Sequence, residues 1–296
     1  MPPFLSRLVC LFTLAVFAGA SPLPAEPATA NGNGGELVYG QAGGHDLRLD
    51  LYLPDAAPPR GKKWPVVLFL HGGGWRFGSK AEGKGLAALF TQKGIAFASA
   101  DYRLDTEALW PAQIHDAKTA VRYLRANTRL GLDPARIGVC GTSAGGHLAA
   151  LLGTTPGVAA LEDRSEGSPG VSTRVRAVCS VSGPVDLGIQ PTTLVGRFFV
   201  RHELGGSAQE KPDLVRQADP SLYVRGGEPP FLLIYGERDH LVLPEHARRM
   251  AAALRAHGGD VTVDLVPGGK HVPLGGEKQR AEIVAFFQKH LAARRP

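Results

Sequence analysis

The chain of 296 residues is long enough for one large domain, and its 44% hydrophobic and 20% charged residues are typical of a globular protein. After the first twenty residues, no apolar run approaches the roughly 18 residues that a membrane span needs, so no stable membrane insertion is expected. The formal net charge is +6, but the basic residues are interspersed with acidic ones, so no nucleic-acid partner is expected.

The N-terminus has the pattern of an export signal. Arg7 is followed by an apolar run over residues 8–18, and small residues at 18–20 provide a cleavage point. The run is too short to span a bilayer as a helix, although a permanent anchor is the alternative interpretation. We therefore expect residues 1–20 to be a signal peptide, residues 21–35 to be a disordered lead-in, and the mature protein to be secreted or periplasmic.

From residue 36 onward, strand and helix signals alternate, which is typical of an α/β fold with a mostly parallel sheet covered on both faces by helices. Residues 36–41 and 47–53 differ, because their pattern predicts an antiparallel ribbon. Predominantly apolar runs predict buried strands at 66–70, 95–100, 136–140, 175–181, 231–235 and 261–266. Helices are expected at 79–93, 111–129, 144–153 and 277–291.

Residues 36–296 are thus expected to form one catalytic domain with a single long insertion. Residues 187–227 lack a sheet signal and hold two short helical segments, near 194–201 and 212–217. An insertion at the carboxyl ends of the strands is expected to act as a small cap over the pocket.

Gly141-Thr142-Ser143-Ala144-Gly145 is the candidate nucleophile motif. A Gly-x-Ser-x-Gly turn between a strand and a helix exposes the serine hydroxyl, and the glycines leave room for the chain to reverse. Such a pattern can arise by chance in a chain with 38 glycines, but here a strand precedes it and an Ala-rich helix follows. Ser143 is therefore the predicted nucleophile.

His71-Gly72-Gly73-Gly74 follows an apolar strand and is the candidate oxyanion loop. The backbone N–H groups of Gly73 and Gly74, with that of Ala144, are expected to stabilise a negative oxygen. His71 is expected to anchor this loop rather than to act as a base. Trp75 is expected to line the acyl pocket, with plain packing as the alternative.

The acid and the base should follow the serine in chain order in this type of fold. Asp239 lies just after one predicted strand and His271 lies in the loop after the last strand, where active-site groups gather. Asp239 is the predicted acid and His271 the predicted base, with Asp186 and His240 as the rival acid and base.

Other titratable groups are assigned structural roles. His147 is expected to be a hydrogen-bonded core residue, and His246 a surface or helix residue. No metal is expected, because the ten histidines show no His-x-x-x-His spacing and no Cys-x-x-Cys is present. Cys140 and Cys179 are expected to be reduced core residues, with a disulfide as the alternative.

Taken together, the motifs resemble those of the α/β-hydrolase esterases related to hormone-sensitive lipase. Within that family they are similar to the secreted bacterial branch that includes feruloyl and acetyl-xylan esterases. The resemblance covers residues 36–291 and rests on residues 71–75, 101–104, 110–111, 116, 141–147, 239 and 271. It implies hydrolysis of carboxylic esters, no cofactor, and an eight-stranded sheet whose second strand runs antiparallel.

The expected substrate is a small or polysaccharide-linked ester. Too few residues precede Glu36 for the longer N-terminal cap of relatives with lipid-like substrates, which favours short or aromatic acyl groups such as acetyl and feruloyl. The alternatives are a peptidase or amidase with the same triad, and a catalytically silent binding module. The sequence does not indicate the oligomeric state.

Overall fold

The computed structural model describes residues 34–58, 60–163, 168–189, 193–274 and 276–293. The predicted signal peptide and residues 21–33 of the predicted lead-in lie outside the described residues. Gly34 and Gly35, which were also assigned to the lead-in, instead begin the first strand. None of the helices in the described ranges is both long and apolar enough to cross a membrane.

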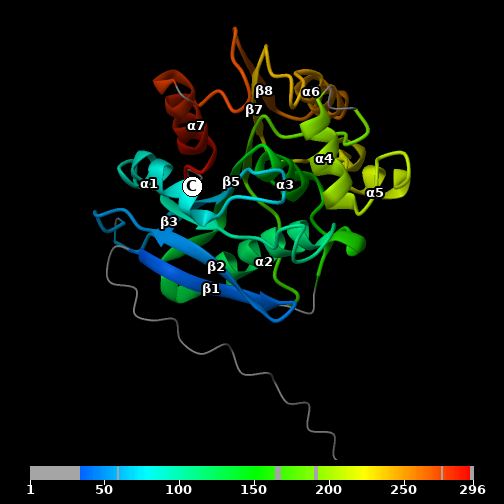
Figure 1. Ribbon diagram of the computed structural model, residues 1–296. Coiled ribbons are helices and arrows are strands. Elements are labelled where there is room, and N and C mark those ends of the chain that lie inside the picture. The colour runs from blue at the N-terminus through cyan, green and yellow to red at the C-terminus, as the bar shows by residue number, and fades with distance from the viewer. Residues whose placement is uncertain (1–33, 59, 164–167, 190–192, 275, 294–296) are drawn as a thin grey trace, which may run out of the picture.

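One mostly parallel sheet organises the described part of the chain (Figure 1). Its order is β1-β2-β4-β3-β5-β6-β7-β8, and β2 runs antiparallel to both of its neighbours. The predicted fold class is therefore confirmed, including the antiparallel second strand. The strands are β1 (Gly34–Ala42), β2 (His45–Tyr52), β3 (Trp64–Leu70), β4 (Ala96–Ala100), β5 (Leu132–Thr142), β6 (Ala177–Val181), β7 (Phe231–Gly236) and β8 (Val261–Val266).

Helices cover both faces of the sheet, with α1 and α7 on one side (Figure 1). Helices α2, α3 and α6 cover the other side, and α4 and α5 belong to the predicted insertion. The α-helices are α1 (Lys84–Thr91), α2 (Ala112–Ala126), α3 (Ala144–Thr154), α4 (Leu194–Leu204), α5 (Pro212–Gln217), α6 (Glu245–Ala256) and α7 (Glu277–His290). The 3-10 helices are η1 (Lys80–Gly83), η2 (Thr128–Leu130), η3 (Ala159–Leu161) and η4 (Pro220–Tyr223).

Strand β3 explains why the central runs of sequence are continuously apolar. Val66, Leu68 and Leu70 belong to the core beneath α2 and α3. Val67 and Phe69 belong to the second core, beneath α1 and α7. Because alternate side chains of a strand point to opposite faces, a strand covered on both faces has no position left for a polar residue.

Two predicted helices differ from the observed ones. The segment 79–93 divides at Gly83 into η1 and α1. Gly83 packs against Ser99, which leaves no room for a Cβ atom, and the Ser99 hydroxyl donates to the carbonyl of Lys80 at 2.7 Å. The segment 111–129 also divides, with α2 ending at Ala126 and η2 following it.

The two cysteines lie side by side on neighbouring strands. Cys140 of β5 is the register partner of Cys179 of β6. Both are buried and free, which confirms the expectation of reduced core residues.

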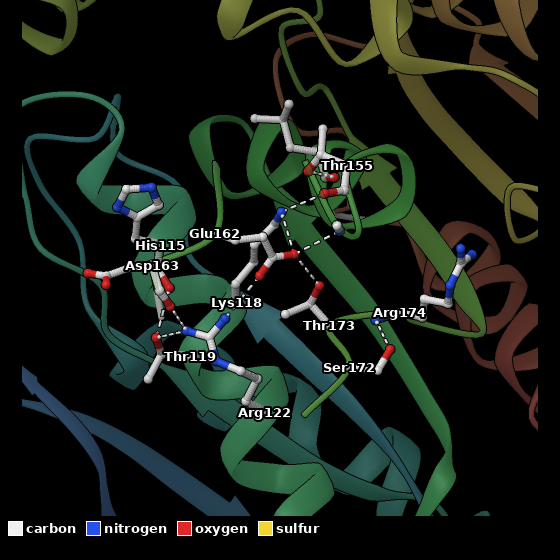
Figure 2. A network of polar contacts seen from close by, with 12 residues as sticks. His115, Lys118, Thr119, Arg122, Thr155, Glu162, Asp163, Ser172, Thr173 and Arg174 are labelled. Carbon is white, nitrogen blue, oxygen red and sulfur yellow. Dashed lines mark hydrogen bonds and ion pairs between the residues drawn. The ribbon is translucent and has the colours of Figure 1, made fainter. Parts of the chain in front are cut away.

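A buried ion-pair network joins α2 to the segments that lead into β6 (Figure 2). Glu162 accepts hydrogen bonds from Lys118 and Arg122, both at 3.1 Å, and from the hydroxyl of Thr173 at 2.7 Å. The Lys118 ammonium also donates to the carbonyl of Thr155 at 2.6 Å. Burial lowers the pKa of Lys118 to about 8, although Glu162 acts in the opposite direction. The network thus depends on one carboxylate that serves two buried cations.

Replacing that carboxylate should destabilise the fold. Glu162→Gln removes the carboxylate charge that pairs with the buried Lys118 and Arg122, so we expect the free energy of unfolding to fall by about 3 kcal/mol or more. Urea denaturation measures the change. Glu245→Gln, which removes an exposed pair with Arg248, is the matched control and should cost less than about 0.5 kcal/mol. Equal losses in the two variants would contradict this account.

Candidate active site

Ser143 occupies a strained turn between β5 and α3. Its backbone has φ 52° and ψ −118°, which is an uncommon conformation for any residue except glycine. A Cβ atom at Gly145 would overlap the backbone carbonyl groups of Leu70 and His71, and one at Gly141 would overlap Gly145. The two glycines of the motif therefore allow the start of α3 to pass close to the end of β3, as a nucleophile turn requires.

The structure brings Ser143, His271 and Asp239 into one hydrogen-bonded chain. His271 Nε2 lies 2.9 Å from Ser143 Oγ, and His271 Nδ1 lies 2.7 Å from Asp239 Oδ2. The three residues follow β5, β8 and β7, which are parallel strands whose carboxyl ends meet at the same edge of the sheet. An additional hydrogen bond, from the N–H of Val272 to Ser182 Oγ at 3.1 Å, fixes the loop that carries His271.

Asp239 is held as a carboxylate. Burial alone would raise its pKa, but hydrogen bonds from His271 and from the N–H groups of Val242 and Leu241 outweigh burial and hold the pKa below its usual range. The two N–H groups both donate to Asp239 Oδ1 at 2.9 Å, which leaves Oδ2 for His271. This arrangement orients the imidazole so that its other nitrogen faces the serine.

Asp186, the rival acid, is bonded to other groups than His271. Asp186 accepts the N–H of Gly188 at 2.7 Å and pairs with Arg249 at 3.1 Å. His240, the rival base, is exposed, whereas His271 is the imidazole in contact with Ser143.

The glycine loop lies beside Ser143 and is anchored from behind. His71 is buried, its ring stacks on that of Tyr102 at 4.2 Å, and the Tyr102 hydroxyl donates to the His71 carbonyl at 2.9 Å. His71 Nδ1 also lies 2.8 Å from the carbonyl of Gly72, so this histidine is positioned as an anchor. Gly73 and Gly74 have φ of 102° and 61°. Among the described residues, no hydrogen bond uses the N–H of Gly73, Gly74 or Ala144, which leaves these donors for a ligand.

A pocket of about 310 Å³ opens over the serine. Gly73, Gly74, Trp75 and Ala144 line it, as expected from the sequence. Helix α4 supplies a further wall through Gly196, Phe199 and Val200, which sequence reasoning did not single out.

Phe199 connects this wall to the glycine loop. A Cβ atom at Gly74 would fall within the ring of Phe199, so the glycine permits close contact between the loop and α4. Trp75 is buried, and its ring meets that of His147 edge-on at 5.3 Å. Trp75 therefore packs against the core while it also borders the pocket.

Two histidines near the pocket are buried and neutral. His147 lies in the core with Nε2 2.6 Å from the carbonyl of Ala218, as expected, and burial lowers its pKa to about 4. His246 lies in α6, but it borders the pocket instead of the surface, and its Nδ1 accepts the N–H of Val185 at 3.1 Å. Burial lowers the pKa of His246 to about 4 as well. Because Met250 is buried one turn later, the helical period of α6 could have placed His246 on the inner face.

Glu203 of α4 is a buried carboxyl behind the site. It is fully buried, and neither of its side-chain oxygens has a hydrogen-bond partner among the described residues. Burial, followed by the nearby Asp105, raises its pKa well above the usual range. An unpaired buried carboxylate is costly, so burial favours the protonated form of Glu203.

The side chains of the described residues form no group of three or more His, Cys, Asp and Glu arranged to hold a metal ion.

The fold and this site define an α/β-hydrolase with a serine at the nucleophile turn. The chain belongs to the BD-FAE family, whose model matches residues 49–254. Esterase LipC of Mycobacterium tuberculosis is 36% identical over 200 residues, which are 66% of this chain and 49% of that protein. The chain spans about half the length of the curated relatives it matches.

Two solved structures are also similar. A bifunctional GH43-CE protein of Bacteroides eggerthii has a TM-score of 0.76 and 33% identity, with coverage of 86% of this chain and 38% of that one. Thermogutta terrifontis esterase 2 with bound propionate has a TM-score of 0.72 and 26% identity, with coverage of 90% and 97%. The resemblance to α/β-hydrolase esterases inferred from the sequence is thus confirmed.

Glu203 should make stability depend on pH. Its pKa is raised in the folded state, so above the usual carboxyl range the folded protein keeps a proton that the unfolded chain loses, and stability falls as pH rises. Glu203→Gln removes this titration. We expect the free energy of unfolding of the variant, relative to that of the wild type, to rise between pH 5 and pH 8 by at most about 1.4 kcal/mol per pH unit. Thermal unfolding of both proteins at each pH measures the difference, and a constant difference would contradict the assignment.

Proposed function

We propose that this protein is a serine carboxylic ester hydrolase that forms an acyl-enzyme on Ser143. The observation that carries the proposal is the chain of hydrogen bonds from Ser143 through His271 to Asp239, at 2.9 and 2.7 Å. Similar proteins named as esterases support it.

In this mechanism, His271 takes the proton of Ser143 as the hydroxyl attacks the ester carbonyl. Asp239 keeps the imidazole in the tautomer with Nδ1 protonated and stabilises the imidazolium that forms. The N–H groups of Gly73, Gly74 and Ala144 stabilise the oxyanion, each by about 3 kcal/mol. His271 then gives its proton to the departing alcohol, and water repeats the cycle on the acyl-enzyme.

The proposed substrates carry short or aromatic acyl groups, such as acetyl or feruloyl groups on plant polysaccharide. The pocket of about 310 Å³, with Trp75 and Phe199 among its lining residues, suits a small or flat apolar group. The B. eggerthii relative is a GH43-CE protein, which is in keeping with a carbohydrate ester.

The proposed location is secreted or periplasmic. The proposal rests on residues 1–20, with Arg7 before the apolar run over 8–18. The mature protein would then carry a formal charge of about +5, because Arg7 is the one charged residue removed from the total of +6.

Removal of the nucleophile should abolish activity. We expect the wild type to hydrolyse p-nitrophenyl acetate and Ser143→Ala to lose at least about 10³-fold in kcat/KM, because no acyl-enzyme can form. T. terrifontis esterase 2 is phosphorylated by paraoxon. Intact mass should therefore show one added diethyl phosphate on the wild type and none on Ser143→Ala. An inert wild type, or an equally fast variant, would falsify the proposed function.

The acyl group of the substrate should be limited in length. Among p-nitrophenyl esters of increasing chain length, we expect kcat/KM to fall steeply beyond about six carbons because the pocket is small. Acetylated xylan and methyl ferulate complete the panel. Rates that stay flat or rise with chain length would exclude the short-acyl assignment.

A further inference from the structure

Several of the exposed large apolar side chains lie close together on one part of the surface. Among the described residues, the exposed large hydrophobic side chains include Phe77, Leu194, Val195 and Phe198, with exposed fractions of 57%, 82%, 55% and 43%. Phe77 follows the glycine loop, and the other three lie in the first half of α4. We call these four residues the apolar rim.

The apolar rim adjoins the mouth of the pocket. Phe199 lines the pocket, and its ring contacts those of Phe77 and Phe198, with centroids 6.3 and 5.6 Å apart. The opposite face of α4 is already buried through Val200 and Leu204. Helix α4 thus has a second apolar face that core packing does not explain, which is typical of a surface that meets a partner.

Cationic side chains accompany the rim. The Arg76 guanidinium lies over the ring of Phe198, 5.6 Å from its centroid. Arg201 is exposed one turn beyond Arg197 on α4. Arg76 and Arg201 pair with Asp105 and Glu210, whereas the guanidinium of Arg197 forms no ion pair or hydrogen bond with a described residue. A protruding apolar patch beside an unpaired arginine is the pattern of an interfacial helix.

The chemistry of the rim selects its partner. The rim also has the rings of Phe77 and Phe198, but Leu194, its most exposed side chain, and its neighbour Val195 are aliphatic and offer no flat ring on which a sugar could stack. A second copy of the chain, related by a two-fold axis, would bring the two Arg197 side chains toward each other and remove them from water. An anionic lipid surface satisfies both features, because its acyl region accepts aliphatic side chains and its headgroups attract arginine.

We propose that the apolar rim docks the protein reversibly on the surface of anionic lipid, with the mouth of the pocket facing that surface. Leu194 and Val195 enter the headgroup boundary, while Arg197 and Arg201 lie at the level of the phosphates. Attachment to the lipid surface is independent of the proposed function. Its advantage for catalysis, which is access to short-acyl or aromatic esters dissolved in the lipid, rests on the proposed function.

Vesicle sedimentation tests the attachment. The protein is mixed with large unilamellar vesicles of phosphatidylglycerol or of phosphatidylcholine, and the bound fraction is measured. We expect binding to phosphatidylglycerol that weakens in 0.5 M salt, and at least about tenfold weaker partitioning to phosphatidylcholine. Leu194→Asn with Val195→Asn should reduce partitioning about tenfold or more, and Arg197→Glu should reduce it mainly for the anionic vesicles.

Matched controls separate docking from damage to the protein. Leu222→Asn removes an exposed leucine of η4, with an exposed fraction of 43%, and should bind vesicles like the wild type. Melting temperatures of the rim variants should match that of the wild type, because the replaced side chains are exposed. Hydrolysis of p-nitrophenyl acetate by the wild type tests the proposed function separately.

Three results would overturn the proposal. One is a wild type that does not sediment with phosphatidylglycerol. Another is a rim variant that binds as tightly as Leu222→Asn. The third is a wild-type dimer in analytical ultracentrifugation that Leu194→Asn with Val195→Asn converts to monomer, since the rim would then be a contact between copies.

Discussion

The close passage of α3 beneath the end of β3 is the constraint on which the site depends. At that point Gly145 lies against the carbonyl groups of Leu70 and His71, where no Cβ atom fits. The chain can turn so sharply only if Ser143 adopts a positive φ, and this lifts its hydroxyl above the sheet edge. The same passage places the first N–H of α3 beside the glycine loop. Strain at one residue therefore positions both the candidate nucleophile and one of the candidate oxyanion donors.

Helix α4 completes the site from outside the sheet. Its inner face lines the pocket and packs Phe199 onto Gly74, so the shape of the glycine loop depends on the insertion. Glu203 of the same helix is a buried carboxyl with a raised pKa, and the outer face carries the apolar rim. Helix α4 thus supports the glycine loop, forms one wall of the pocket and provides the exposed surface around the mouth of the pocket. Changes on α4 can therefore alter substrate choice without contact with Ser143.

Much of the fold and the site was predictable because local rules are strong at these positions. Continuous apolar runs such as Val66–Leu70 have one stable place, inside a doubly covered sheet. The glycine patterns around Ser143 and at residues 72–74 identify backbone that needs special conformations. By contrast, His246 was expected to be a surface or helix residue with no contact to the pocket singled out, and the network around Glu162 was not predicted at all. Their partners lie up to 61 residues away in the chain, so no local pattern identifies these contacts, although the period of α6 could have placed His246 on the inner face.

The sequence by itself determined the class of fold, the nucleophile turn, the glycine loop and the order in which Ser143, Asp239 and His271 occur. These follow from local periodicity and from backbone conformations that only certain residue types, such as glycine, adopt easily. Only the tertiary structure decided that His271 contacts both Ser143 and Asp239, that Asp186 pairs with Arg249 instead, and that α4 forms the wall of the pocket. The reason is that these contacts join segments far apart in the chain, and the packing of the whole sheet sets the distances between them.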